Sequence, residues 1–182
     1  MSKGILVALA FLLFAAVAGL TYHLHPRSSA FGPPYHVRTE FEFLVHAPYS
    51  VAAPLFGPQG ERAWASDSWN PLFMYPQPAR DIPGAVFQVS HGHHNSTWVN
   101  TAFDLEQGHI QYVYVIPEMM VTLIDLHLSK TADATDVHVA YERTALSAAA
   151  NEHVREFGEA DRNNGKTWGN DIERYLATQR HP

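Results

Sequence analysis

The 182-residue sequence contains no cysteine. This absence excludes a disulfide-stabilised scaffold, a catalytic thiolate, a zinc site with cysteine ligands and a lipoprotein anchor on an acylated cysteine. Charged residues are also scarce, at 16% of the chain, and the 12 Lys and Arg are outnumbered by 18 Asp and Glu. The net charge of −6 and the lack of a basic stripe argue against a nucleic-acid partner.

Two common catalytic signatures are missing as well. The segment Gly57-Pro58-Gln59-Gly60 lacks the Lys-Ser/Thr pair of a phosphate-binding loop, and no Gly-x-Ser-x-Gly nucleophile elbow occurs. Hydrophobic residues make up 46% of the chain, which is ordinary for a globular protein and excludes disorder. The sequence therefore predicts a folded domain without a resident cofactor.

The N-terminus carries a membrane signal. Residues 4–20 include no polar side chain, and as a helix they would span about 25 Å; Thr21 and Tyr22 extend the segment to residues 4–22. The tripeptide Ala16-Val17-Ala18 also fits a signal-peptide cleavage site. Because the apolar run is longer than an ordinary signal-peptide core and no polar region precedes that site, we favour an uncleaved single-pass anchor.

The remaining chain is acidic. Residues 1–24 form the anchor or signal segment, 25–34 a Pro/Gly/Ser-rich linker and 35–180 the expected domain. Beyond residue 27 the chain holds ten basic and 18 acidic residues, a net charge of −8, together with ten of the 12 histidines. Lys3 before the span and Arg27 after it weakly favour an orientation with the domain outside the cytoplasm.

In the domain, apolar segments alternate with short polar connections, as in an antiparallel sheet. Short polar connections separate its apolar segments, which predicts hairpins. Expected strands are residues 35–46, a short strand among the prolines of residues 71–83, and 85–91, 97–103, 109–116, 120–128 and 136–144. Short helices are expected from Pro48 and over 61–66, and a long C-terminal helix from Ala148, with a break at Asn163-Asn164-Gly165. A curved sheet partly covered by one helix leaves room for a cavity that holds an apolar guest.

The order of these elements and five short motifs resemble the SRPBCC superfamily, the helix-grip proteins that include Bet v 1, START and polyketide-cyclase-like members. The motifs are residues 54–65 with 69–71, 84–87 with Trp98, 112–117, 135–141 with 144–147 and Asn151, and Trp168 with Ile172, Tyr175 and Leu176. They are most similar to one uncharacterised bacterial branch. The resemblance implies an α+β helix-grip fold of about seven strands around a long C-terminal helix, and an internal cavity for a hydrophobic small molecule or lipid.

Aromatic and apolar residues of the expected inner faces are the candidate cavity residues. They are Trp69, Phe87, Trp98, Tyr112, Tyr114, Tyr141, Trp168 and Ile172. Tyrosine and tryptophan would give an apolar pocket a few orienting hydrogen bonds. Plain core packing is the competing interpretation for each of them.

Histidines supply the candidates for metal chemistry. His91 and His93 lie two residues apart, so their rings would share a face of a continuous strand, and His109 on the next strand could be a third ligand. The competing interpretation is a solvated hairpin tip. Asp125 and His127 could form an acid–base pair, but the apolar residues of that strand have the opposite parity, which predicts that both point outward.

Glu61, Arg62 and Trp64 are expected to be structural, with Arg62 paired to a carboxylate and its stem packed on Trp64; a role at the mouth of the cavity is the second interpretation. The sequence thus favours a membrane-anchored domain that binds a hydrophobic small molecule or lipid without catalysis. Two alternatives stay open, a cyclase- or hydrolase-like enzyme that uses polar groups of the cavity and an interaction protein of the cell envelope.

Overall fold

The computed structural model describes residues 33–91 and 94–179, except for the side chain of His91. Residues 34–179 belong to one compact unit. The predicted anchor at residues 4–22 and most of the linker lie outside the described residues. Within the described ranges no helix is both long and apolar enough to cross a bilayer.

Thirteen elements make up the described fold. Short 3₁₀ helices are labelled η. In chain order the elements are β1 (His36–Val45), α2 (Tyr49–Ala52), η1 (Ala53–Phe56), η2 (Gly60–Ala63), β2 (Leu72–Tyr75), β3 (Val86–His91), β4 (His94–Asp104), β5 (His109–Ile116), β6 (Met120–Lys130), β7 (Thr135–Ala145), η3 (Ala148–Ala150), α3 (Asn151–Asp161) and α4 (Asn164–Gln179).

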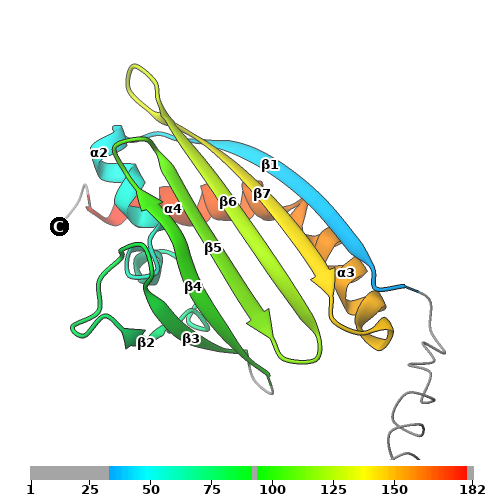
Figure 1. Ribbon diagram of the computed structural model, residues 1–182. Coiled ribbons are helices and arrows are strands. Elements are labelled where there is room, and N and C mark those ends of the chain that lie inside the picture. The colour runs from blue at the N-terminus through cyan, green and yellow to red at the C-terminus, as the bar shows by residue number, and fades with distance from the viewer. Residues whose placement is uncertain (1–32, 92–93, 180–182) are drawn as a thin grey trace, which may run out of the picture. The chain divides into compact units, whose positions relative to one another are not determined.

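All seven strands form one antiparallel sheet, as the sequence predicts. The strand order is β1-β7-β6-β5-β4-β3-β2, so the first strand pairs with the last and the other neighbours are joined along the chain. Figure 1 shows the strands as one curved layer with α3 and α4 on one side of it. The two-residue period decides the faces: on β5, Ile110, Tyr112, Tyr114 and Ile116 are buried, while the residues between them are partly exposed.

The hairpin between β3 and β4 is tighter than the sequence pattern predicts. We expect β4 to begin at Thr97, but it begins at His94, where His94 pairs with His91. Ser96 explains the extension, because it is fully buried and its hydroxyl donates to the Val89 carbonyl at 3.2 Å while accepting from Trp98 Nε1 at 2.7 Å. A polar residue that satisfies its hydrogen bonds internally can therefore continue a strand.

The segment from α2 to η2 packs against the inner face of the sheet. The Tyr112 hydroxyl donates to the Phe56 carbonyl, and Trp64 Nε1 donates to the Leu55 carbonyl at 2.7 Å. Gly60 permits the fold-back from η1 to η2, since a Cβ atom there would lie 2.0 Å from the Pro54 carbonyl oxygen. This close approach fixes where the next residue, Glu61, is placed.

The C-terminal helix is divided into α3 and α4. The break lies at Arg162 and Asn163, next to the predicted break at residues 163–165, where Asn and Gly have poor helix propensity. Gly165 allows α4 to lie close to β1, because a Cβ atom there would be 3.0 Å from the Phe41 ring. The helices contact β1 and β7, and this one-sided packing leaves the inner faces of the middle strands for a cavity.

Candidate functional site

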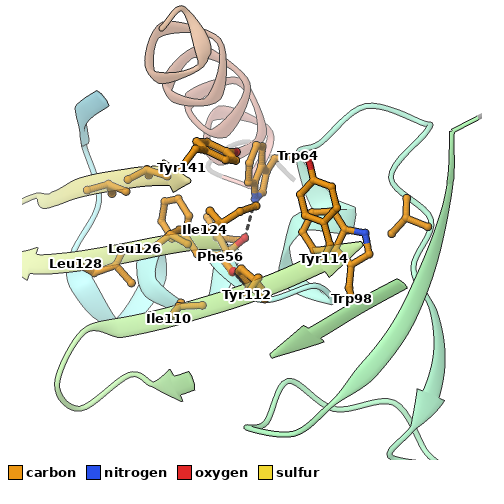
Figure 2. Close-up of a cluster of buried hydrophobic side chains, with 14 of the residues drawn as sticks. Phe56, Trp64, Trp98, Ile110, Tyr112, Tyr114, Ile124, Leu126, Leu128 and Tyr141 are labelled. Atoms are coloured by element: carbon orange, nitrogen blue, oxygen red, sulfur yellow. Dashed lines mark hydrogen bonds between the residues drawn. The ribbon is translucent and has the colours of Figure 1, made fainter. Parts of the chain in front are cut away.

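A cavity of about 620 Å³ lies on the inner side of the sheet. Its walls come from β4, β5, β6 and β7, from the segment 61–69, and from α3 and α4. Figure 2 shows Trp64, Tyr114 and Tyr141 on the side of the sheet that faces the C-terminal helix. Most of the lining is aromatic or aliphatic, and the volume is in the range of small-molecule pockets.

Six of the eight predicted cavity residues line this space. They are Trp69, Trp98, Tyr112, Tyr114, Tyr141 and Trp168. Phe87 and Ile172 are not among the residues that line it, and both are fully buried in the core. Phe87 lies behind Trp98, whose ring stacks on it at a centroid distance of 5.7 Å. A role of the other six in ligand binding stays a prediction.

The aromatic lining forms two contact groups. Trp98 stacks on Tyr114 with ring centroids 4.1 Å apart, and Trp69 meets Trp98 edge to face at 5.3 Å. On the helix side, Trp64 and Trp168 lie 5.5 Å apart. Trp64 also lines the cavity, for which the sequence offers only the second interpretation of this residue, because its position after η2 gives no periodic signal. Such rings present large apolar faces with a negative quadrupole to a guest.

A buried ion pair closes one wall of the cavity. Arg143 of β7 donates from Nε and Nη2 to the two carboxylate oxygens of Asp161 of α3, each at 2.7 Å. Arg143 Nη1 donates to the Tyr114 hydroxyl at 2.5 Å and to Thr122 Oγ1 at 3.1 Å. Burial alone would lower the pKa of Arg143, but the hydrogen bonds with Asp161 raise it above its ordinary value. The guanidinium is therefore permanently charged, and four of its five N–H groups are engaged.

This ion pair is not among the predictions from the sequence, although the sequence contains a signal for it. Arg143 has the same strand parity as Val137, Val139 and Tyr141, which are buried. A charged residue at an inward position predicts a buried partner, since an isolated charge is costly away from water. No pattern in the sequence identifies that partner as Asp161.

Glu61 is the second charged residue of the cavity wall, in a segment for which a role at the cavity mouth is the second interpretation of the sequence. The residue lines the cavity and is 8% exposed. Burial, and secondarily the nearby Asp81, raise the pKa of Glu61 well above its ordinary value. Burial likewise raises the pKa of the Tyr112 and Tyr141 phenols. The protonated, neutral forms of all three groups are favoured.

Arg62 differs from its expected role. Its guanidinium donates to Gln59 Oε1 and Asn70 Oδ1, each at 3.0 Å, and to the Pro71 carbonyl. The Arg62 guanidinium thus holds the loop after η2 through amide oxygens. Among the described residues, no carboxylate lies within hydrogen-bond distance of it. The expectation of a carboxylate partner is wrong because the chain turns back at residues 70–71, which brings carbonyl groups to the guanidinium.

The outer face of the sheet carries a set of possible metal ligands. His109 Nε2 lies 2.7 Å and His127 Nε2 3.3 Å from the two oxygens of Asp125, and the imidazole rings stack at 4.9 Å. The three ligand atoms lie within 4.8 Å of one another, a donor set that suits zinc. Burial opposes ionisation of Asp125, but the hydrogen bonds from His109 and Gln111 lower its pKa.

This cluster shares only His109 with the histidine ligands predicted from the sequence. Asp125 and His127 have the outward strand parity that the sequence predicts. His109 contacts these two residues, and His93 lies outside the described residues, as does the side chain of His91. The predicted grouping of His91, His93 and His109 therefore stays untested, whereas the acid–base pair is placed on the face opposite to the cavity.

Comparison with solved structures identifies the fold. A protein from Rhizobium leguminosarum superposes with a TM-score of 0.57 at 14% identity, over 80% of this chain and 97% of its own. Norcoclaurine synthase from Thalictrum flavum gives a TM-score of 0.58 at 10% identity, over 82% and 90% of the two chains. Ara h 8.0201 gives 0.56 at 12% identity, over 79% and 99%.

The chain has a helix-grip fold of the Bet v 1 type. No protein-family model matches the sequence, and no curated protein does. At these identities the structural similarity defines the helix-grip architecture and assigns no activity. The cavity of this helix-grip domain is consequently the basis for its functional assignment.

Proposed function

We propose that the helix-grip domain binds a small apolar or amphipathic molecule in its cavity, without converting it. The observation that carries the proposal is the cavity of about 620 Å³ with its aromatic and aliphatic walls. Burial of apolar guest surface supplies about 25 cal/mol per Å², so a guest of modest size gains enough to bind. The fold is suited to such guests: norcoclaurine synthase is described in complex with dopamine and hydroxybenzaldehyde, two small aromatic molecules.

A lipid is included among the proposed guests because of the N-terminus. The apolar run at residues 4–22 would hold the domain at a bilayer, from which a sparingly soluble molecule could enter the cavity. We place the domain on the extracytoplasmic side, following the weak bias of Lys3 and Arg27. The acidic domain would be repelled by anionic headgroups, so the anchor alone would provide the attachment.

Binding is tested with N-phenyl-1-naphthylamine, a neutral probe that fluoresces in apolar surroundings. The full chain in detergent should bind one probe saturably. Ile124→Trp, which adds bulk to the inner face of β6, should weaken binding at least about tenfold, or 1.4 kcal/mol. Leu123→Trp adds the same bulk on the outer face and should bind the probe as the unaltered chain does. Because both variants are measured in the same detergent, partitioning of the probe into micelles affects the two measurements equally.

Equal binding by the two variants, or no saturable binding by the unaltered chain, would exclude the cavity as the binding site. Thermal unfolding shows whether Ile124→Trp is folded. If it is not, Leu126→Phe is the second cavity-filling variant, since Leu126 is also buried and lines the cavity.

Attachment to the membrane is tested by cell fractionation. The full chain should stay in the membrane pellet after an alkaline carbonate wash, and a chain lacking residues 4–22 should be released. Intact mass then separates an uncleaved anchor from cleavage after Ala18. A full chain of uncleaved mass that is washed off would contradict the anchor.

A further inference from the structure

Glu61 is the buried carboxyl group in the cavity wall that the proposed binding of a neutral apolar guest leaves unexplained. The backbone around it is fixed: its N–H donates to the Gly57 carbonyl at 2.8 Å, and its own carbonyl accepts from Trp64 and Ala65. Its side chain is more than nine-tenths buried and lines the cavity. Within the described part of the chain no hydrogen bond or ion pair engages the carboxyl group.

Among the described residues, no cation shifts the pKa of Glu61. Asp81 disfavours the ionisation of Glu61, and Glu61 in turn raises the pKa of the Tyr112 and Tyr141 phenols. Leaving a buried carboxyl group without a partner costs folding free energy. A residue with this cost is best explained by a guest that supplies the missing partner.

The other charges of the cavity wall indicate the sign of that partner. Among the described lining residues Arg143 is the one guanidinium, and Asp161, Tyr114 and Thr122 engage four of its five N–H donors. Asp171 pairs with Arg174 at 2.8 Å near the surface. An anionic guest would thus meet a cation that is already neutralised, whereas a cationic guest would meet the unengaged Glu61.

The aromatic rings favour the same kind of guest. Trp64 and Trp168 lie 5.5 Å apart, and Tyr112 and Tyr141 interact electrostatically with Glu61. Aromatic faces attract organic cations by about 0.5–2 kcal/mol each, most strongly where water is excluded. A carboxylate next to such rings can balance the charge of an amine while the walls bury its apolar body.

We propose that the cavity selects an amphipathic organic cation, an amine with an aromatic or alkyl body, and that Glu61 is its counter-ion. This inference rests on the proposed binding function and names the class of guest. Binding of an ammonium group would ionise Glu61, and the carboxyl proton would leave to solvent. Glu61 is therefore a specificity-determining residue, and the remaining lining supplies the affinity common to neutral and charged guests.

The test compares two probes of equal shape, 2-(naphthalen-1-yl)ethylammonium and 2-(naphthalen-1-yl)ethanol. Calorimetric titration of the full chain in non-ionic detergent at pH 7 should give at least about tenfold tighter binding of the ammonium. Titration in two buffers of different ionisation enthalpy should show proton release with the ammonium and none with the alcohol.

Glu61→Gln keeps the shape and a hydrogen-bonding group but cannot pair with a cation. It should bind both probes with the affinity of the alcohol. Glu106→Gln removes the same charge from the exposed turn before β5 and should keep the preference for the ammonium.

Equal affinity of the unaltered chain for the two probes would overturn the inference and leave the proposed binding function intact. Tighter binding of naphthylacetate, or a preference for the ammonium that survives Glu61→Gln, would overturn it as well. If none of the naphthalene probes binds, the proposed function fails together with the inference.

Discussion

Arg143 and Asp161 form an ion pair almost completely removed from water, with 5% and 3% of their side chains exposed. Desolvation offsets much of the attraction within such a pair, so the pair as a whole contributes little to stability. Removing one member is costly, because the other charge is then buried without its partner. Arg143→Met would leave the Asp161 carboxylate buried without its main partner. We expect a loss of about 3–5 kcal/mol in the free energy of unfolding, measured by chemical denaturation.

The double variant Arg143→Met with Asp161→Leu is the control for this prediction. Because it removes both charges, it should lose much less stability than the sum of the two single variants. Additive losses would show that the two residues act independently.

Glu61, in contrast to the ion pair, destabilises the folded protein when it is ionised. Its pKa is raised in the folded protein, so folding becomes less favourable as the pH rises from the ordinary pKa of glutamate towards the folded value. Glu61→Gln should therefore unfold at a higher temperature than the unaltered chain at pH 7, by about 2–4 °C per kcal/mol gained. Near pH 3.5, where glutamate is protonated in both states, the two midpoints should converge. A difference that does not depend on pH would contradict a buried, titrating Glu61.

At the scale of elements, the turn from η1 to η2 positions both Glu61 and Trp64. Gly60→Ala would bring a Cβ atom to 2.0 Å from the Pro54 carbonyl oxygen and 2.8 Å from Leu55 Cα, which are both backbone atoms. We expect a loss of about 1–3 kcal/mol, measured by urea denaturation, because backbone must move to relieve the overlap.

Gly169→Ala is the matched control, because its Cβ atom would lie 3.4 Å from the Phe43 ring on a helix where alanine is favoured. It should keep or raise the stability. If the two variants lose equal stability, the close approach at Gly60 is not what fixes this turn.

Strand periodicity explains which elements the sequence predicts well. On β5 the buried residues alternate with partly exposed ones, and β7 alternates except at the buried Ala140, so Tyr112, Tyr114 and Tyr141 can be assigned to the inner face without coordinates. The same parity places Phe87 inside, yet it cannot show that Trp98 and Trp69 cover it. Glu61 and Trp64 lie in and after a 3₁₀ turn, where no period exists, and their place in the wall depends on Gly60.

At the scale of the whole molecule, the helix-grip fold gives an acidic domain with an apolar interior. Its topology follows from the order of strands and helices, which the sequence contains. The cavity follows from packing: α3 and α4 contact β1 and β7, and the inner faces of β4, β5 and β6 face the space that remains. Packing of this kind depends on the side-chain volumes of segments far apart in the sequence. The existence of a cavity is therefore easier to predict from the sequence than the residues that line it.

Photoaffinity labelling tests most directly whether this cavity is the binding site. An aliphatic alcohol that carries a diazirine would be irradiated with the full chain, and the labelled residues mapped by peptide mass spectrometry. Binding in the cavity predicts labels at cavity residues such as Met119, Met120 and Trp168, which excess N-phenyl-1-naphthylamine should suppress. Labels that resist this competitor and gather on exposed apolar residues such as Leu72 and Met74 would contradict it.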